Sequence, residues 1–465
     1  MDINQVIIIL FAVIYFGFII YTRRKGDFAE FSVAGRSLGV FLIFSTISAS
    51  FIGPGMTLGL SREGFAGGWF LMFVASITGI AMMISALLFA PKVRQKFTES
   101  YSIGGVIGGK KSHNHPSIKI AVGIISLLSM CAITVAMAYA GGELVNNIFG
   151  FSKQLSIMII TIIVIIYSTF GGIRATIQTD AFQLINFVLI ISLLAIAMLM
   201  SDDFLWSVYT THASAATAVA YDEATLSSII GLYLVWFLTG TGFEAPWISR
   251  FLAAKNPKVT RKATFYAGIF IFFWTILMVF IGSIGAFLHP ELAKTDQILL
   301  QIASFHFPGF LYGIFIIAMI GVILSSMDTL LNNASIIFSE DIVGGLCPTL
   351  PDTQKLKLSK GFTIAVGIIA IGIASYLSSV LDAIISILSI YFPVMAAVIF
   401  FSVYKNQHYW QSALTAMFVG LIAFLTWEFY GNETLPSSLV GIVMSTLSYF
   451  VVDAYCKRNN MIANS

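Results

Sequence analysis

Four residues in one apolar stretch carry side-chain oxygens at spacings that suit a small hard cation. Ser325, Asp328 and Thr329 lie at positions i, i+3 and i+4, so they share one face of a helix, and Ser326 adds another hydroxyl. A carboxylate with neighbouring hydroxyls is an oxygen donor set of the kind that hard cations prefer. Serine hydroxyls alone are explained by bonds to carbonyls of the preceding turn. Asp328 is not, because an acid at mid-membrane costs about 2.5–3.5 kcal/mol and needs a partner.

Two further acids are candidates for chemistry. Asp180 is either an acid favoured by a helix N-terminus or paired with Arg174, or a coordinating or relay carboxylate. Glu244 follows a helix-breaking stretch, where it contacts a solute, lines a gate, or bonds amides that the break exposes. We find no nucleophile–base pair, and the three cysteines are far apart with no metal spacing. The sequence therefore predicts a protein that is not an enzyme, with neither a disulfide nor zinc.

The composition predicts an all-α polytopic membrane protein. Of 465 residues, 58% are hydrophobic and 10% are charged, and the mean hydropathy is +0.92. No polar block is long enough for a second domain, so residues 1–465 are expected to form one transmembrane domain. We predict thirteen transmembrane helices at 4–22, 40–60, 68–91, 118–141, 154–171, 178–200, 227–251, 264–288, 308–342, 361–379, 382–404, 411–430 and 437–456.

Basic residues are distributed unevenly between the predicted loops. All but three of the 25 Lys and Arg residues fall on one side, Arg250 among them; the exceptions are Arg62, Lys153 and Lys294. Because cytoplasmic loops carry the excess of basic residues, we expect the N-terminus outside and the C-terminus in the cytoplasm. The N-terminus lacks the basic region of a signal peptide, so the first segment is expected to be retained in a multi-pass protein of the plasma (inner) membrane.

Two of the predicted helices contain residues that interrupt a helix. The first has Gly-Pro-Gly at 53–55, and the second reads Thr-Gly-Thr-Gly-Phe-Glu-Ala-Pro at 239–246. A proline kink satisfied by neighbouring helices explains either one alone. The second comes five segments after the first, so the two enter the membrane from opposite faces. Paired interruptions of this kind indicate a transporter with inverted repeats. We expect a first repeat at 40–200 and an inverted second repeat at 227–404, with peripheral helices at 1–25 and 411–456.

Several motifs together make the chain resemble the sodium:solute symporter family, which includes proline, pantothenate and sialic acid transporters. The matching stretches are AGRSLG at 34–39, YSTFGGIRA at 167–175 leading to Asp180 and Gln183, RFLAAK at 250–255, and LSS at 324–326 leading to Glu340 and Asp341. The resemblance implies a five-plus-five core of the LeuT type, formed by the second to sixth and seventh to eleventh predicted helices, with three peripheral helices.

The resemblance also implies sodium as the bound ion. Carried over by motif position, the first sodium site comprises backbone carbonyls of Ala49, Ile52 and Val322 and hydroxyls of Ser325 and Ser326. A second site for sodium or a proton comprises Asp180, Ser325, Asp328 and Thr329. Asp328 replaces a residue that is often serine in relatives.

The chain departs from its relatives where the solute is expected. Phe51 occupies a position that is polar in several of them, and no Lys or Arg lies in the middle of a predicted core helix. An anionic solute group would then be held by exposed amides and by helix N-termini. The solute-binding candidates surround both breaks: Ser48, Gly53, Met56, Tyr233, Glu244 and Tyr391.

We therefore expect a secondary active transporter that couples sodium to symport of a small organic solute by alternating access. Its expected partners are sodium ions, the solute and the lipid bilayer, with neither nucleic acid nor an obligate protein partner. The alternatives are a proton-coupled or uncoupled transporter of the same fold, a channel, and a membrane sensor. The sensor is disfavoured because only about nine residues follow the last predicted helix. Glu244 favours a solute that carries an amine.

Overall fold

The chain folds into a bundle of helices that run side by side. The computed structural model describes residues 27–109, 115–406, 409–431 and 434–459. The helices of the first half are α2 (Phe28–Val33), η1 (Ala34–Arg36), α3 (Val40–Phe51), η2 (Gly55–Gly59), α4 (Leu60–Gly67), α5 (Phe70–Leu88), α6 (Ala90–Lys96), α7 (Ile103–Ile107), α8 (Pro116–Phe149), α9 (Lys153–Leu199) and α10 (Trp206–Glu223).

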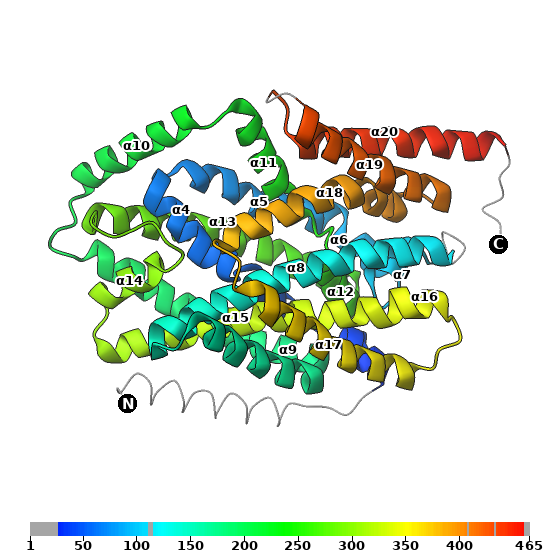
Figure 1. Ribbon diagram of the computed structural model, residues 1–465, viewed down its shortest axis with the longest axis horizontal. Helices are drawn as coiled ribbons and strands as arrows, with labels where there is room; N and C mark the ends of the chain where they lie inside the picture. Colours follow the sequence, from blue (N-terminus) through cyan, green and yellow to red (C-terminus); the bar gives the residue numbers. More distant parts are fainter. Residues whose placement is uncertain (1–26, 110–114, 407–408, 432–433, 460–465) are drawn as a thin grey trace.

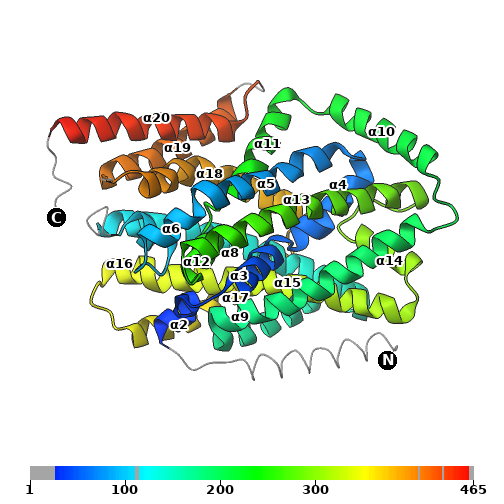
Figure 2. The same cartoon turned by 180° about the vertical axis from the view of Figure 1, so that it is seen from behind.

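The second half continues in the same manner. Its helices are α11 (Leu226–Thr241), α12 (Ala245–Ala253), α13 (Pro257–Leu288), α14 (Ile298–His306), α15 (Gly309–Ile336), η4 (Ile337–Val343), α16 (Gly344–Leu346), α17 (Asp352–Ala374), α18 (Val380–Tyr404), α19 (Trp410–Tyr430) and α20 (Ser437–Arg458). α19 and α20 lie together at one edge of the bundle, and α9 lies with α17 at the opposite edge (Figures 1 and 2).

Both predicted interruptions are confirmed. α3 ends at Phe51, and the chain resumes as a π-helical turn from Gly55, with a bend of 63° between the two parts. α11 ends at Thr241, where Gly242 follows with φ 82°, a conformation that favours glycine. Glu244 then occupies the N-cap position of α12. The breaks place backbone polar groups inside the bundle.

The predicted count of thirteen membrane-spanning helices is not confirmed. Ten helices in the described ranges are long and apolar enough to span a membrane, and the bent pair of α3 with η2 and α4 makes an eleventh. The predicted segment 154–171 corresponds to the shorter helix Lys153–Thr169, because α9 is interrupted at Gly172 (φ 63°, ψ 176°). The predicted segment 4–22, and with it the peripheral helix at 1–25, lies outside the described residues.

Among the described helices that were not predicted, α10 (Trp206–Glu223) is the longest. α10 lies between two spans and packs its Tyr209 into the bundle, where the hydroxyl accepts a hydrogen bond from the indole of Trp69 at 2.9 Å. The same hydroxyl lies 3.2 Å from Ser283 on α13. Burial raises the pKa of Tyr209 above its ordinary value. These contacts hold α10 against α4, α5 and α13.

Glycines bring α4 and α13 into direct backbone contact. A Cβ on Gly64 would lie 2.1 Å from the carbonyl oxygen of Val279, and one on Gly282 would lie 2.0 Å from that of Ser61. Small residues allow such close approach between membrane helices, where dispersion forces and weak polar contacts drive association. α13 thereby fixes the half of the first broken span that follows the break.

A short parallel bridge joins the segment before α3 to the segment after α12. The Leu38 amide donates to the Ala253 carbonyl at 3.3 Å, and the Lys255 amide donates to the Leu38 carbonyl at 2.9 Å. Arg94 on α6 donates from Nε to the Ala254 carbonyl at 2.6 Å. Both broken spans are thus connected at one end of the bundle.

Candidate cation and solute site

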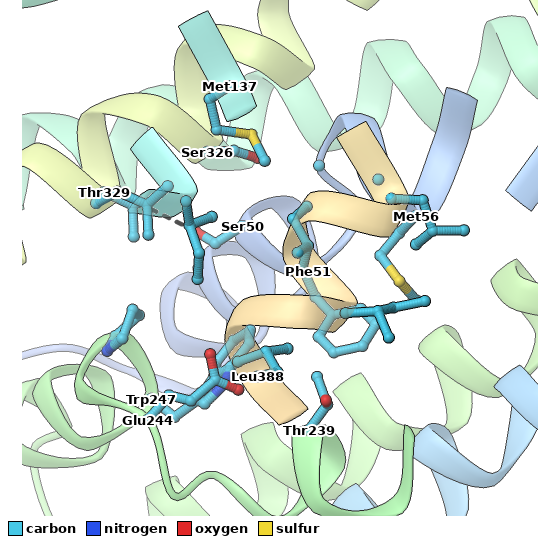
Figure 3. A pocket seen from close by; sticks show the side chains of 18 of the residues that line it. Ser50, Phe51, Met56, Met137, Thr239, Glu244, Trp247, Ser326, Thr329 and Leu388 are labelled. Carbon is cyan, nitrogen blue, oxygen red and sulfur yellow. Dashed lines mark hydrogen bonds between the residues drawn. The ribbon is translucent and has the colours of Figure 1, made fainter. Parts of the chain in front are cut away.

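A cavity lies where the two breaks meet α15 and α18. Its volume is about 110 Å³, and Figure 3 shows its walls. Gly53 and Met56 come from the first break, Glu244 from the second, and Ser326 and Thr329 from α15. The cavity therefore collects residues that are far apart in the sequence but adjacent to interrupted backbone.

The end of α3 packs directly against α15. A Cβ on Gly53 would lie 2.5 Å from the Ser326 hydroxyl oxygen, so only glycine fits there without a shift. Within the described residues, the Ser326 hydroxyl has no hydrogen-bond partner. A helix leaves its last carbonyls without intrahelical partners, and Ala49 belongs to the last turn of α3. The structure thus brings a free hydroxyl to the end of a broken helix.

The other predicted ligands of the first sodium site are also buried at this contact. Ala49, Ile52 and Val322 are each at most 2% exposed. The Ile52 carbonyl accepts a hydrogen bond from Thr57 Oγ1 at 2.8 Å, and a carbonyl oxygen retains a second lone pair. Ser325 donates its proton to Asp180 at 2.6 Å, which leaves the hydroxyl lone pairs available. This oxygen-rich arrangement fits a small cation.

Asp180 lies in the core of the bundle. The side chain is fully buried, and its carboxylate accepts hydrogen bonds from Thr46 on α3 and Ser325 on α15, each at 2.6 Å. The alternative pairing with Arg174 is wrong, because Arg174 pairs with Glu30 of α2. Asp180 therefore connects three helices: α3, α9 and α15.

A buried arginine at this site was missed. Arg250 is 1% exposed, and its Nη2 lies 4.0 Å from Asp180. In the sequence, Arg250 falls at the end of the predicted segment 227–251, and the burial of its side chain in the bundle was not predicted. α12 continues for nine residues after the second break, so Arg250 falls inside the bundle. Arg250 follows Glu244 by six residues, which is fewer than two helical turns. This short spacing could have indicated from the sequence that Arg250 lies near the second break.

Arg250 uses its remaining donors on neutral oxygens. Nη2 donates to Ser50 at 2.6 Å and to Thr329 at 2.7 Å, and Nε donates to Thr46 at 3.1 Å. Nη1 donates to the Pro246 carbonyl at 3.0 Å. The hydroxyls of Ser50 and Thr329 also lie 3.2 Å apart, as the dashed line in Figure 3 marks. Two cavity-lining hydroxyls are thus anchored to a guanidinium group behind the wall.

The predicted second site is only partly assembled. Ser325 contacts Asp180, whereas Thr329 is bound by Arg250. Asp328 is 1% exposed, and its carboxylate lies beside the hydroxyls of Tyr167 and Thr176. It lies close enough to Asp180 and Arg250 to interact with both charges. Two carboxylates facing one guanidinium leave a formal charge of −1, which a monovalent cation would balance.

The candidates for solute binding fall into two groups. Gly53, Met56 and Glu244 line the cavity, whereas Ser48 and Tyr233 are not among its lining residues. Tyr391 acts behind the wall, where its hydroxyl donates to the Phe243 carbonyl at 3.0 Å and so satisfies backbone exposed by the second break.

A cluster of charged residues joins the broken span to α18 at one end of the bundle. Arg62 on α4 lies 3.3 Å from Asp296 and 3.1 Å from Asp382. Burial raises the pKa of Asp296, while the Val380 amide and the charge of Arg62 act in the opposite direction. Glu63 contacts both Arg62 and Lys294. This end of the bundle is therefore held by ion pairs rather than apolar contacts alone.

A helical membrane bundle in which two interrupted spans meet at a cavity is the architecture of many secondary transporters. A model of the sodium:solute symporter family matches residues 31–420, and the chain belongs to this family. It is therefore a multi-pass transporter and not an enzyme, and it couples a small solute to sodium.

Individual relatives are distant but similar over their whole length. Sodium/proline symporter 2 of Staphylococcus saprophyticus is 23% identical, over 97% of this chain and 92% of its own. The osmoregulated proline transporter OpuE of Bacillus subtilis is 22% identical, over 94% and 91%. A sodium-coupled sialic acid symporter in a substrate-bound outward-open state has a TM-score of 0.83 at 18% identity, covering 98% of both chains. MhsT, solved with L-phenylalanine, has a TM-score of 0.55 at 12% identity, covering 89% of this chain and 97% of its own.

Proposed function

We propose that the protein carries a small organic nutrient across the plasma membrane together with sodium, by alternating access. In this proposal the solute occupies the cavity between the two breaks. Sodium binds between α3 and α15, held by the carbonyls of Ala49, Ile52 and Val322 and the hydroxyls of Ser325 and Ser326. The observation that carries the proposal is the close approach of Gly53, just after α3, to the Ser326 hydroxyl, which has no hydrogen-bond partner in the part of the chain that the structure describes.

The proposal includes the organisation predicted from the sequence. The residues 40–200 and 227–404 form the two inverted repeats of a thirteen-helix chain in the bilayer, with the N-terminus outside and no obligate protein partner. Since α3 and α15 belong to different repeats, sodium bound between them favours one arrangement of the repeats over the other. The affinity for solute then depends on sodium through a coupling free energy.

The sodium gradient is sufficient for accumulation of a neutral solute. One sodium ion crossing about 100 mV releases roughly 2.3 kcal/mol. A tenfold concentration gradient adds about 1.4 kcal/mol. Together they support a solute gradient of about several hundredfold, since each 1.4 kcal/mol corresponds to one factor of ten.

The test is sodium-dependent uptake by proteoliposomes. Replacing Ser325 and Ser326 together by alanine should raise the sodium concentration for half-maximal uptake at least several-fold, because two ligand oxygens are lost. Ser304→Ala provides the control, since Ser304 is an exposed serine on α14. An unchanged sodium dependence in the double variant would contradict the assignment of the first site.

We also propose that Asp328 takes a second monovalent cation, either sodium or a proton. Its carboxylate is buried, and the cluster with Asp180 and Arg250 has an excess negative charge. Uptake measured with sodium replaced by potassium at fixed pH separates the two ions. Transport that continues unchanged in potassium would contradict sodium coupling altogether.

A further inference from the structure

Glu244 is a buried carboxylate that its own helix does not use. It occupies the N-cap position of α12, yet its side chain makes no capping hydrogen bond. The residue is 6% exposed, and Oε1 has no hydrogen-bond partner among the residues that the structure describes. In the structure, Glu244 therefore does not hold the break open by accepting hydrogen bonds from amides that the break exposes. Tyr391 bonds the backbone at this break instead.

The carboxylate is directed into the cavity. Figure 3 shows it beside Trp247 on the cavity wall. Among the described residues that line this cavity, Glu244 is the one with an ionisable side chain, and Arg250 behind the opposite hydroxyls donates to other acceptors. A charge buried without a partner is strongly unfavourable, so a carboxylate in this position calls for a cationic group inside the cavity.

The surroundings of Glu244 suit an organic cation better than a metal ion. The adjacent walls are formed by Phe51, Trp247 and Leu388, and the first two rings lie with centroids 5.6 Å apart. Sodium needs several oxygen ligands, whereas aromatic faces attract ammonium groups by cation–π interaction. A protonated amine satisfies both features: it donates to the carboxylate and packs its alkyl part on the rings.

We propose that the transported solute carries a protonated amine and that Glu244 binds it. This inference depends on the proposed function, in which the cavity is the solute site. The volume of about 110 Å³ limits the solute. A 150 Å³ cavity holds one benzene, so a cavity of this smaller volume accepts a molecule of about four to six non-hydrogen atoms. The class is thus a small amine, with the size of a short amino acid.

The first experiment compares isosteres that differ only in the amine. Purified wild-type protein in nanodiscs is titrated, in sodium and in potassium, with alanine against lactate and with glycine against glycolate. Melting temperature reports binding. We expect at least one amine in a broad panel of small amines and amino acids to raise the melting temperature in sodium, and its oxygen isostere to have at least tenfold weaker affinity. Equal binding of the isosteres, or no binding by any amine in the panel, would overturn the proposal.

The second experiment tests the residue. Glu244→Gln keeps the shape and removes the charge, and we expect the affinity for the amine to fall at least about tenfold, as hydrogen bonds to charged groups predict. Glu223→Gln on exposed α10 is the matched control. A shift in melting temperature with sodium alone reports that the variant is folded. If Glu244→Gln does not fold, Glu244→Asp takes its place, since it keeps the charge but retracts it from the cavity. Unchanged amine affinity in the substituted protein would overturn the assignment.

The outcomes separate this inference from the proposed function. Sodium-driven uptake of a solute without an amine would overturn the role of Glu244 and leave sodium symport intact. Amine binding that sodium does not strengthen, with no sodium-driven uptake, would contradict the proposed function and support the role of Glu244 in binding.

Discussion

Replacing Arg250 by methionine tests the buried charge cluster, because methionine retains much of the side chain's length and removes its charge. The guanidinium lies 4.0 Å from Asp180 and donates to the hydroxyls of Ser50 and Thr329. Removing one partner from a buried pair costs about 3–5 kcal/mol, because the other charge is left buried and uncompensated. We expect Arg250→Met to lower the free energy of unfolding by about this amount.

A double-mutant cycle identifies the source of that loss. If the unpaired charge of Asp180 is responsible, adding Asp180→Asn to Arg250→Met should recover about 1 kcal/mol or more, since contacting residues couple by about 0.5–3 kcal/mol. Unfolding by SDS in mixed micelles, followed by tryptophan fluorescence, measures the four free energies. A double variant whose loss equals the sum of the two single losses would refute the reasoning and assign the effect of Arg250 to its hydroxyl contacts.

Three other predictions concern different parts of the molecule. Asp328→Asn should change the number of ions transported per solute or the pH dependence of uptake, measured by dual-isotope flux; wild-type values for both would make Asp328 structural. Gly64→Ala should destabilise the protein by about 1–3 kcal/mol or more, because its Cβ would meet the Val279 carbonyl at 2.1 Å, whereas Gly372→Ala has open space and serves as the control in melting experiments. Burial and a neighbouring histidine lower the pKa of His306, so the unfolded chain binds more protons and stability should fall as the pH drops through about 6.5. His306→Gln should flatten that dependence of melting temperature on pH, and an unaltered dependence would exclude this imidazole as its source.

The sequence was informative where a structural feature is local. Gly-Pro-Gly at 53–55 and the glycines before Glu244 interrupt helices by their own backbone chemistry, whatever surrounds them. Ser326, which was predicted to be a ligand of the ion, lies at the first break, where a Cβ on Gly53 would meet its hydroxyl. Family resemblance added the ion, which composition alone does not identify.

The features that were missed depend on tertiary packing. The contact of Asp180 with Thr46 joins residues 134 apart in the chain, and that of Arg250 with Thr46 joins residues 204 apart. Arg250 lies at the end of the predicted segment 227–251, and hydropathy does not reveal that its side chain turns into the bundle. The interruption at Gly172, by contrast, falls where the predicted segments 154–171 and 178–200 are separated, and the structure has it as a kink within α9.

The backbone bridge at Leu38 determines part of the free energy needed to move α3 away from α12. Any displacement that parts α3 from α12 must break its two backbone hydrogen bonds. Such bonds contribute about 0.5–1.5 kcal/mol each, so separating the two segments costs about 1–3 kcal/mol. One sodium ion that crosses a membrane potential of 100 mV releases a comparable free energy, about 2.3 kcal/mol. These two hydrogen bonds are thus strong enough to favour the conformation in which α3 and α12 are joined. They are also weak enough to break at a cost comparable to the free energy that one sodium ion releases.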